Sequence, residues 1–324
     1  MWVTPRAADG SVVTGANAVC TAQGISRCFN RIEVRSGSTP IETFQYDDVV
    51  GLFYSTQSDK KKKWLKLTEG HNDTAAFTNG TREFGGVQLI FSLANVDNVF
   101  LNPAVASFTI ENPALRTCLI YPDPSVVHAL TSAVASGRSA WLPTSEIESF
   151  RTVGLNSTNI LVTNSVGSYT SIDSVRYACY KQPEYNARSN DKYKRFSSNG
   201  LREWSVEVAN LTNPATRKFR NGNGSIETIM ITFLSEAGGL NNMDDICNLP
   251  DDFYTPHFQW GLNFQSQSEQ HASGISTVGA ANTNIVGDFT FAAPITSDVV
   301  INTYVTCSTL LEVTQGLINT WRVF

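Results

Sequence analysis

The chain consists largely of short segments in which apolar and polar residues alternate. In the clearest of them, Leu201–Ala209, Trp204, Val206 and Val208 lie on one face and polar residues occupy the positions between them. Alternation with a period of two is typical of β-strands that bury one face. Further strands are expected at residues 2–4, 11–14, 28–44, 64–67, 87–94, 106–110, 115–121, 159–163, 174–180, 226–234, 257–264, 284–291, 299–306 and 310–313. Residues 49–54 are expected to form a strand or a short helix. The sequence therefore predicts an all-β protein.

Three of these segments predict which residues are buried. In residues 28–44, Cys28, Ile32 and Val34 share a face, and Ser36–Ser38 turns the chain, which predicts a half-buried hairpin. In the second half, the alternating segments predict a core made by the following residues: Trp204, Val206, Val208, Ile229, Ile231 and Phe233.

The stretch Cys118–Val153 departs from this pattern, because its apolar residues fall at helical spacing. Asp123 can cap a helix whose first residue is Pro124, and Gly137 can end it. After Trp141, a second short helix is expected, capped by Thr144 or Ser145, with its apolar side at residues 147, 150 and 153. We interpret the stretch as a junction between two similar all-β units. The alternative is an ordinary surface helix between two strands of a single sandwich.

The length favours two units, since 324 residues exceed the usual size of a single core. We place a first unit at 1–122, a helical connector at 123–153 and a second unit at 154–324. Hydrophobic residues make up 41% of the chain and charged residues only 16%, which suits β-sandwiches better than helical bundles. Three polar stretches, Ser55–Gly86, Lys181–Gly200 and Ser235–Thr255, are expected to be long loops.

The net charge of −5 argues against a dedicated nucleic-acid surface, which would normally be basic. The only dense basic run, Lys60–Lys63, lies between two β-like segments and is interpreted as a solvated loop tip. No signal peptide and no apolar run long enough to span a bilayer is recognised.

The six cysteines have no CxxC spacing, and metal binding is not expected. They lie at positions 20, 28, 118, 179, 247 and 307. Those inside β-like runs, Cys28, Cys118, Cys179 and Cys307, are expected to act as small buried apolar side chains, and disulfides are left open. Five N-x-S/T sequons occur, but we expect no glycans without a secretory signal.

The sequence offers little catalytic chemistry. The four histidines, His71, His128, His257 and His271, are scattered, and no G-x-S-x-G, H-E-x-x-H or P-loop motif is present. The acidic pairs at 244–245 and 251–252 suggest a calcium site, but the regular ligand spacing is absent and a solvated loop is the simpler interpretation. We expect no catalytic, cofactor-binding or metal-binding residues and no enzymatic activity.

The succession of four segments resembles a known family of viral proteins. These are ISRCFNRIEVRSGSTPIETF, then VQLIFSLANVDN, then the run from FTIENPALRTCLIYPD through LPTSEIESF to NILVTNSVGSYTSIDSVRYACY, and finally INTYVTCSTLLEVTQG. Their order is similar to that in the double jelly-roll major capsid proteins of membrane-containing tailless phages, adenovirus-like viruses and large DNA viruses. The resemblance covers most of the chain, and it lies in patterns of alternation and their order.

The resemblance implies two jelly-roll barrels side by side, joined by a short helical linker. It implies a structural subunit of the virion that forms homotrimeric, pseudo-hexagonal capsomers in an icosahedral shell, without cofactors. The implied partners are further copies of the chain, neighbouring capsomers, penton and minor capsid proteins, and an internal membrane beneath some shells, but no sequence-specific nucleic acid. The three polar loops would then make trimer contacts or face outward.

One departure from the family concerns the start of the first barrel. Family members carry a further strand, and often an arm, ahead of the position of Met1 to Val3. Either the first barrel is trimmed, or another segment or chain covers its edge, since an open edge strand invites pairing.

Two other functions stay open. A carbohydrate-binding or hydrolytic β-sandwich would present an exposed aromatic platform or a carboxylate pair, and the candidate aromatics are Trp64, Trp141, Trp204, Trp260 and Trp321. The alternating neighbourhood of Trp204 favours the core for that residue. A penton or spike protein would normally have a single jelly roll.

Overall fold

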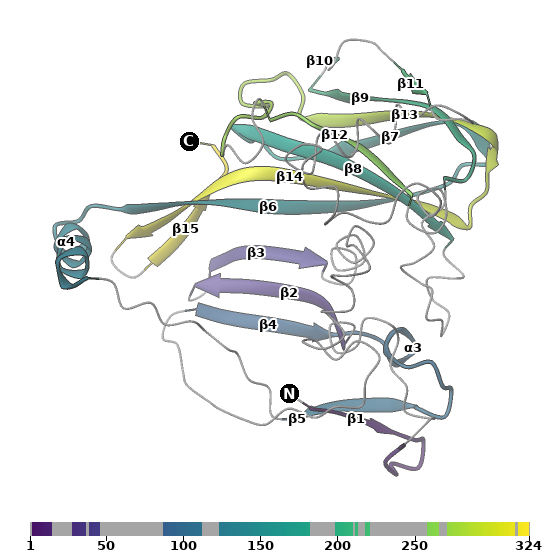
Figure 1. Cartoon of the computed structure of the whole chain (residues 1–324), viewed down its shortest axis with the longest axis horizontal. Helices are drawn as coiled ribbons and strands as arrows, with labels where there is room; N and C mark the ends of the chain where they lie inside the picture. Colours follow the sequence, from purple (N-terminus) through teal and green to yellow (C-terminus); the bar gives the residue numbers. More distant parts are fainter. Residues whose placement is uncertain are drawn as a thin grey trace.

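Strands dominate the described part of the chain and form four sheets (Figure 1). The computed structural model describes residues 2–14, 28–36, 39–45, 87–111, 123–181, 198–209, 211–212, 218–220, 258–265, 271–314 and 317–323. Two of the sheets are built from residues before 112 and two from residues after 139.

The first sheet of the second half is built around one long strand. Its members are β6 (Ala140–Val153), β8 (Ser171–Lys181), β12 (Gln259–Asn263), β14 (Val299–Thr314) and β15 (Leu317–Trp321). Strand β14 pairs with β6 along one side, and on its other side first with β8 and then with β15. Strand β12 extends the sheet beyond β8. All of these pairings are antiparallel.

The second sheet of this half has the order β10, β9, β13, β7, and β11 also pairs with β9. Its members are β7 (Ser157–Ser165), β9 (Leu201–Val208), β10 (Leu211–Thr212), β11 (Phe219–Arg220) and β13 (Asn284–Ile295). Strands β6, β7, β8 and β9 alternate between the two sheets, and so do β12, β13 and β14. This alternation between two antiparallel five-stranded layers is the topology of a jelly roll, with short or added strands at the edges.

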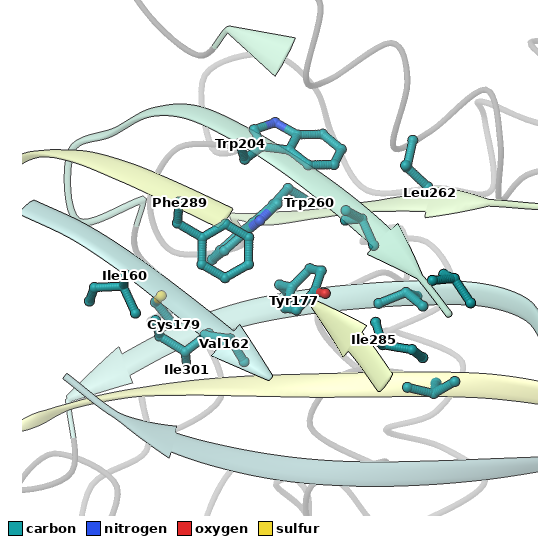
Figure 2. Close-up of a cluster of buried hydrophobic side chains, with 14 of the residues drawn as sticks. Ile160, Val162, Tyr177, Cys179, Trp204, Trp260, Leu262, Ile285, Phe289 and Ile301 are labelled. Atoms are coloured by element: carbon teal, nitrogen blue, oxygen red, sulfur yellow. The ribbon is translucent and has the colours of Figure 1, made fainter. Parts of the chain in front are cut away.

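Large aromatic side chains fill the space between these two sheets (Figure 2). Tyr177 of β8 stacks on Trp260 of β12, with ring centroids 5.7 Å apart. Phe289 of β13, from the opposite sheet, meets both rings edge-on at 4.8 and 5.3 Å. Because such pairs join the two layers, the aromatic cluster fixes how one sheet lies on the other.

The first half contributes two smaller sheets. Strands β1 (Trp2–Arg6) and β5 (Ser107–Glu111) pair with each other, and β2 (Phe29–Ser36) lies between β3 (Thr39–Gln45) and β4 (Val87–Leu93). A single-turn helix, α3 (Val96–Val99), follows β4. These elements share a small core of their own, formed by Cys28, Ala94, Val99, Phe100 and Val105.

Most of the predicted strands that fall in the described residues are confirmed. The hairpin at 28–44 forms as β2 and β3, and Trp204, Val206 and Val208 are buried in β9 as expected. The segment 11–14 contributes only an isolated bridge between Val12 and Arg6. The predicted strands 299–306 and 310–313 are one continuous strand, β14, and β15 was not predicted.

The helical connector is only partly correct. Helix α4 (Pro124–Ala135) forms where predicted; Asp123 accepts a hydrogen bond from the backbone N–H of Ser125, and Gly137 has a φ of +79°. The second helix is wrong, because residues 140–153 form β6 and pair with β14 over their whole length. The spacing of three between Ile147, Phe150 and Val153 imitated a helix, whereas in a strand it places Phe150 on the opposite face from the other two.

The three described cysteines, Cys28, Cys179 and Cys307, are buried, as predicted, and they are free. Burial raises the pKa of the Cys179 thiol to about 12, so it behaves as an apolar side chain. None of the described helices is long and apolar enough to cross a bilayer. The loops Ser55–Gly86 and Ser235–Thr255, most of Lys181–Gly200, the predicted strands 49–54, 64–67, 115–121 and 226–234, and Ile229, Ile231 and Phe233 lie outside the described residues.

Candidate functional site

Two glutamates on β6 point into the end of the second barrel. Glu146 lies opposite Cys307 on β14, and Glu148 lies opposite Val305. Cys307 and Val305 both belong to the hydrophobic core, so the two carboxylates share the inner face of the sheet. Glu146 is only 7% exposed. A buried carboxylate must find charged or hydrogen-bonding partners.

Arg322 supplies the positive partner from the residue that follows β15. Its Nε donates to Oε2 of Glu146 at 3.0 Å, and its Nη2 donates to Oε1 at 2.6 Å. Burial by itself would lower the pKa of Arg322, but the hydrogen bond to Glu146 and the nearby negative charges outweigh burial and raise it. The bidentate ion pair therefore joins the C-terminal residues to β6.

Tyr169 bridges the two glutamates just ahead of β8. Its hydroxyl group donates to Oε1 of Glu148 at 2.5 Å, and Oε2 of Glu146 lies 3.2 Å from the same oxygen. The guanidinium carbon of Arg322 lies 5.3 Å from the centre of the Tyr169 ring, within cation–π range. Burial and the bond to Glu148 raise the pKa of the Tyr169 hydroxyl, so it stays a donor.

A third glutamate approaches this cluster from the first half. Strand β3 lies next to β6 and β15 (Figure 1) and carries Glu42. Burial, and then the negative charge of Glu146, raise the pKa of the Glu42 carboxyl. We call Glu42, Glu146, Glu148, Tyr169 and Arg322 the carboxylate cluster.

A second polar network lies beside the cluster and holds a loop in place. The buried carboxylate of Asp173 accepts from the hydroxyls of Ser171 and Ser308 at 2.6 and 2.8 Å. His271 places Nε2 within 3.0 Å of the carbonyl oxygens of Thr144 and Thr309, so this nitrogen carries the proton and donates. This network attaches the segment that begins at residue 271 to β6, β8 and β14.

The surface of the same end carries an exposed tryptophan pair. Trp141 of β6 and Trp321 of β15 are 48% and 44% exposed, with ring centroids 5.9 Å apart. The indole N–H of Trp321 donates to Glu312, which also accepts from Ser139. The two rings are inclined by 57°, which does not make a flat platform for a sugar ring.

The other candidate residues that the sequence analysis named do not belong to the carboxylate cluster. Trp204 and Trp260 are fully buried, so they serve the core. His128 lies exposed on α4, apart from the carboxylate cluster. His271 donates a hydrogen bond to backbone carbonyl oxygens. His71, His257, Trp64 and the acidic pairs at 244–245 and 251–252 lie outside the described residues.

The contacts of the carboxylate cluster suit a structural role, in which it joins separate elements, better than a catalytic one. Every one of its side-chain contacts joins segments that are distant in sequence, namely β6, the start of β8 and the C-terminal residues. Within the part of the chain that the structure describes, no three His, Cys, Asp or Glu side chains are placed to hold a metal ion.

The sequence did not reveal this cluster. Glu146 and Glu148 alternate with Ser145 and Ile147, and this pattern predicts that glutamates face solvent. Their partner Arg322 is 176 residues from Glu146, so nothing local marks the pair. The only usable signal was the spacing of two between the glutamates, which places both on one face of a strand.

The sequence matches no protein-family model and no curated protein. The structure, in contrast, resembles solved viral capsid proteins. VP54 of PBCV-1, as fitted into a reconstruction of the virophage Sputnik, superposes with a TM-score of 0.53 at 8% identity, covering 98% of this chain and 94% of that one. The Faustovirus major capsid protein gives a TM-score of 0.55 at 10% identity, covering 96% and 77%. The Sputnik virophage structure gives 0.52 at 9% identity, covering 98% and 80%.

The chain has the double jelly-roll fold. The match spans nearly the whole length of VP54, so it includes both halves of the present chain. The double jelly roll predicted from the order of the sequence segments is therefore confirmed as a fold class.

Proposed function

We propose that this double jelly-roll chain is the major capsid protein of an icosahedral virus. The observation that carries the proposal is the fold match, which covers 98% of this chain and 94% of VP54 and extends to the Faustovirus major capsid protein. We therefore propose a structural role in the capsid shell of the virion, without enzymatic activity and without cofactors.

The proposed assembly is a homotrimer. A ring of three identical chains needs a head-to-tail contact between two different surfaces of each chain, because a single self-complementary surface closes a dimer. Two sandwiches in each chain would place six blocks around the three-fold axis, which gives a pseudo-hexagonal outline. The further proposed partners are neighbouring capsomers, penton and minor capsid proteins, and an internal membrane, but no sequence-specific nucleic acid.

Native mass and particle shape test the proposal. Light scattering of the purified protein is expected to give about three times the chain mass of 35.5 kDa, and negative-stain images of the same peak are expected to show hexagonal particles. A monomer at all concentrations would contradict the capsomer assignment. A five-fold particle would favour a penton protein instead.

The second candidate function is carbohydrate binding. Of the candidate tryptophans that the structure describes, only Trp141 and Trp321 are exposed, although their inclined rings do not form a flat platform. A glycan array separates the two functions. Binding that is lost in Trp141→Ala, together with a monomeric mass, would support the carbohydrate-binding alternative. Absence of binding together with a trimeric mass would support the capsid assignment.

A further inference from the structure

One end of the second barrel continues beyond the hydrophobic core as a three-stranded ribbon. Strand β14 pairs with β8 only as far as Ser308, whereas β6 and β15 accompany it to Val313. We call residues 141–143, 310–313 and 319–321 the apolar ribbon, and none of them belongs to the core of the barrel. Helix α4 precedes the ribbon in the chain and lies at the same end of the molecule (Figure 1). The ribbon is therefore a surface feature of that end.

The apolar ribbon exposes apolar side chains on both of its faces. Trp141 and Leu142 are consecutive residues of β6, and successive side chains of a strand point to opposite faces. Trp141 is 48% exposed and Leu142 is 53% exposed. Trp321 of β15, whose ring lies against that of Trp141, is 44% exposed. Exposed apolar side chains that gather in this way mark a contact with a partner or a membrane.

A lipid bilayer suits a ribbon that is apolar on both faces better than a second protein does. A flat protein surface would cover one face of the ribbon and leave the other in water, whereas lipid surrounds both. Tryptophan is enriched at the headgroup level of membranes, where its ring contacts both apolar and polar groups. Among the described strands β6 pairs only with β14, so its outer backbone edge needs water or headgroups as partners. The ribbon can therefore enter the headgroup region but not cross the hydrocarbon core.

The charges around the ribbon fit a phospholipid surface. Residues 124–145 and 313–324, which include α4 and the outer strands of the ribbon, contain no Asp or Glu side chain, although the whole chain has 29. Glu312 is the one carboxylate of the ribbon, and it accepts a hydrogen bond from the indole N–H of Trp321. Arg138 is exposed just ahead of β6. Its guanidinium group can bind the phosphate of a headgroup.

We propose that the apolar ribbon is a docking site for a phospholipid bilayer, in which Trp141, Leu142 and Trp321 enter the headgroup region and Arg138 binds lipid phosphate. The site lies on the second barrel and needs no other chain to complete it. This inference deepens the membrane contact of the proposed capsid protein and rests on that proposed function.

Flotation of the purified full chain with phospholipid vesicles tests the docking site. The chain is expected to bind vesicles of phosphatidylcholine. Binding should tighten about fivefold when about one third of the lipid is replaced by anionic phosphatidylserine, because one arginine faces the surface. Arg138→Gln should abolish this gain and leave the binding to phosphatidylcholine unchanged.

The double variant Trp141→Ser, Leu142→Ser removes one apolar side chain from each face of the ribbon. Its partition coefficient is expected to fall at least about tenfold on both kinds of vesicle, and circular dichroism verifies that the fold is kept. Leu161→Ser is the matched control, because Leu161 is 64% exposed on β7, outside the ribbon. This control should bind vesicles as the unmodified chain does.

Light scattering of the same proteins separates this inference from the proposed function. The unmodified chain and the serine variants should have the same native mass, because the ribbon faces lipid and not another copy. The docking site is overturned if the unmodified chain does not float with vesicles, or if Leu161→Ser weakens flotation as much as the double variant does. Loss of the native assembly in the double variant would also overturn it, since the ribbon would then be a contact between copies. A monomeric mass with intact vesicle binding would support the docking site and contradict the capsid assignment.

Discussion

Tyr177 buries its hydroxyl group inside the second barrel without a hydrogen-bond partner among the residues that the structure describes. Removing an unsatisfied buried hydroxyl removes a desolvation cost, so Tyr177→Phe is expected to raise the free energy of unfolding by up to about 1 kcal/mol. Denaturant titration of the purified protein measures this change.

Tyr304 is the matched control for the Tyr177 prediction. It is equally buried, but its hydroxyl oxygen accepts from Nδ2 of Asn302 at 3.0 Å. Tyr304→Phe leaves that donor unpaired and is expected to lower the free energy of unfolding by about 1 kcal/mol. Equal effects in the two variants would show that the Tyr177 hydroxyl is not an isolated group.

Single residues of the core could be predicted from the sequence, whereas the residues of the carboxylate cluster could not. Trp204 is identified by its alternating neighbours, because the hydrophobic period is a local property of the chain. Glu146 breaks the local rule that charged residues face solvent. It is buried because Arg322 and Tyr169 satisfy it, and those contacts exist only after the chain has folded.

Strands β8 and β12 approach too closely at Gly261 to accept a side chain there. A Cβ at this position would overlap the backbone carbonyl oxygen of Val175, which cannot rotate away. Gly261→Ala is therefore expected to push β12 away from β8 and to lower the free energy of unfolding by about 1–3 kcal/mol. Thermal unfolding followed by near-ultraviolet circular dichroism reports the change, because Trp260 is adjacent.

Gly167→Ala is the control for this prediction. Its Cβ would lie 3.4 Å from Cε2 of Tyr169, an ordinary van der Waals contact, so little change in stability is expected. If both alanine variants lower the stability equally, the close approach of the two backbones is not the cause.

Whole strands could be predicted where the alternation of apolar and polar residues is unbroken. Where the alternation is interrupted, the prediction was wrong. Strands β7, β9 and β13 follow from their alternation, and their observed burial alternates in the same way. Most of strand β6 was interpreted as a short helix, because Ile147, Phe150 and Val153 are spaced by three. Only pairing with β14, which begins 146 residues after Val153 in the sequence, identifies it as a strand.

At the scale of the whole molecule, the second barrel has a hydrophobic core of its own, and we propose that it folds alone. A fragment from Ser139 to Phe324 contains every strand of both its sheets. It is expected to unfold in one cooperative transition. Denaturant titration followed by tryptophan fluorescence measures this behaviour.

The shorter fragment from Gly154 to Phe324, which begins at the boundary predicted from the sequence, is the comparison. It lacks β6, so β14 loses one of its partners, and Arg322 loses Glu146. We expect this fragment to be less stable, or not to fold. If the two fragments have equal stability, β6 is dispensable and the second unit begins after it.

The order of segments along the chain sufficed to predict the double jelly-roll fold, because many short alternating strands arranged in two halves are typical of jelly rolls. The boundary between the halves was harder to place. Residues 140–153 follow a helix in sequence but belong to the second barrel by pairing, and local pattern cannot distinguish a connector from an edge strand.

The ladder between β6 and β14 also has a mechanical consequence. The two strands are antiparallel and pair over all 14 residues of β6, and α4 is attached to one end of that strand. A pull on α4 along the strand axis loads these hydrogen bonds in shear, so many must yield together, whereas a perpendicular pull would open them one at a time. The second barrel should therefore resist tension along β6 far better than tension across it.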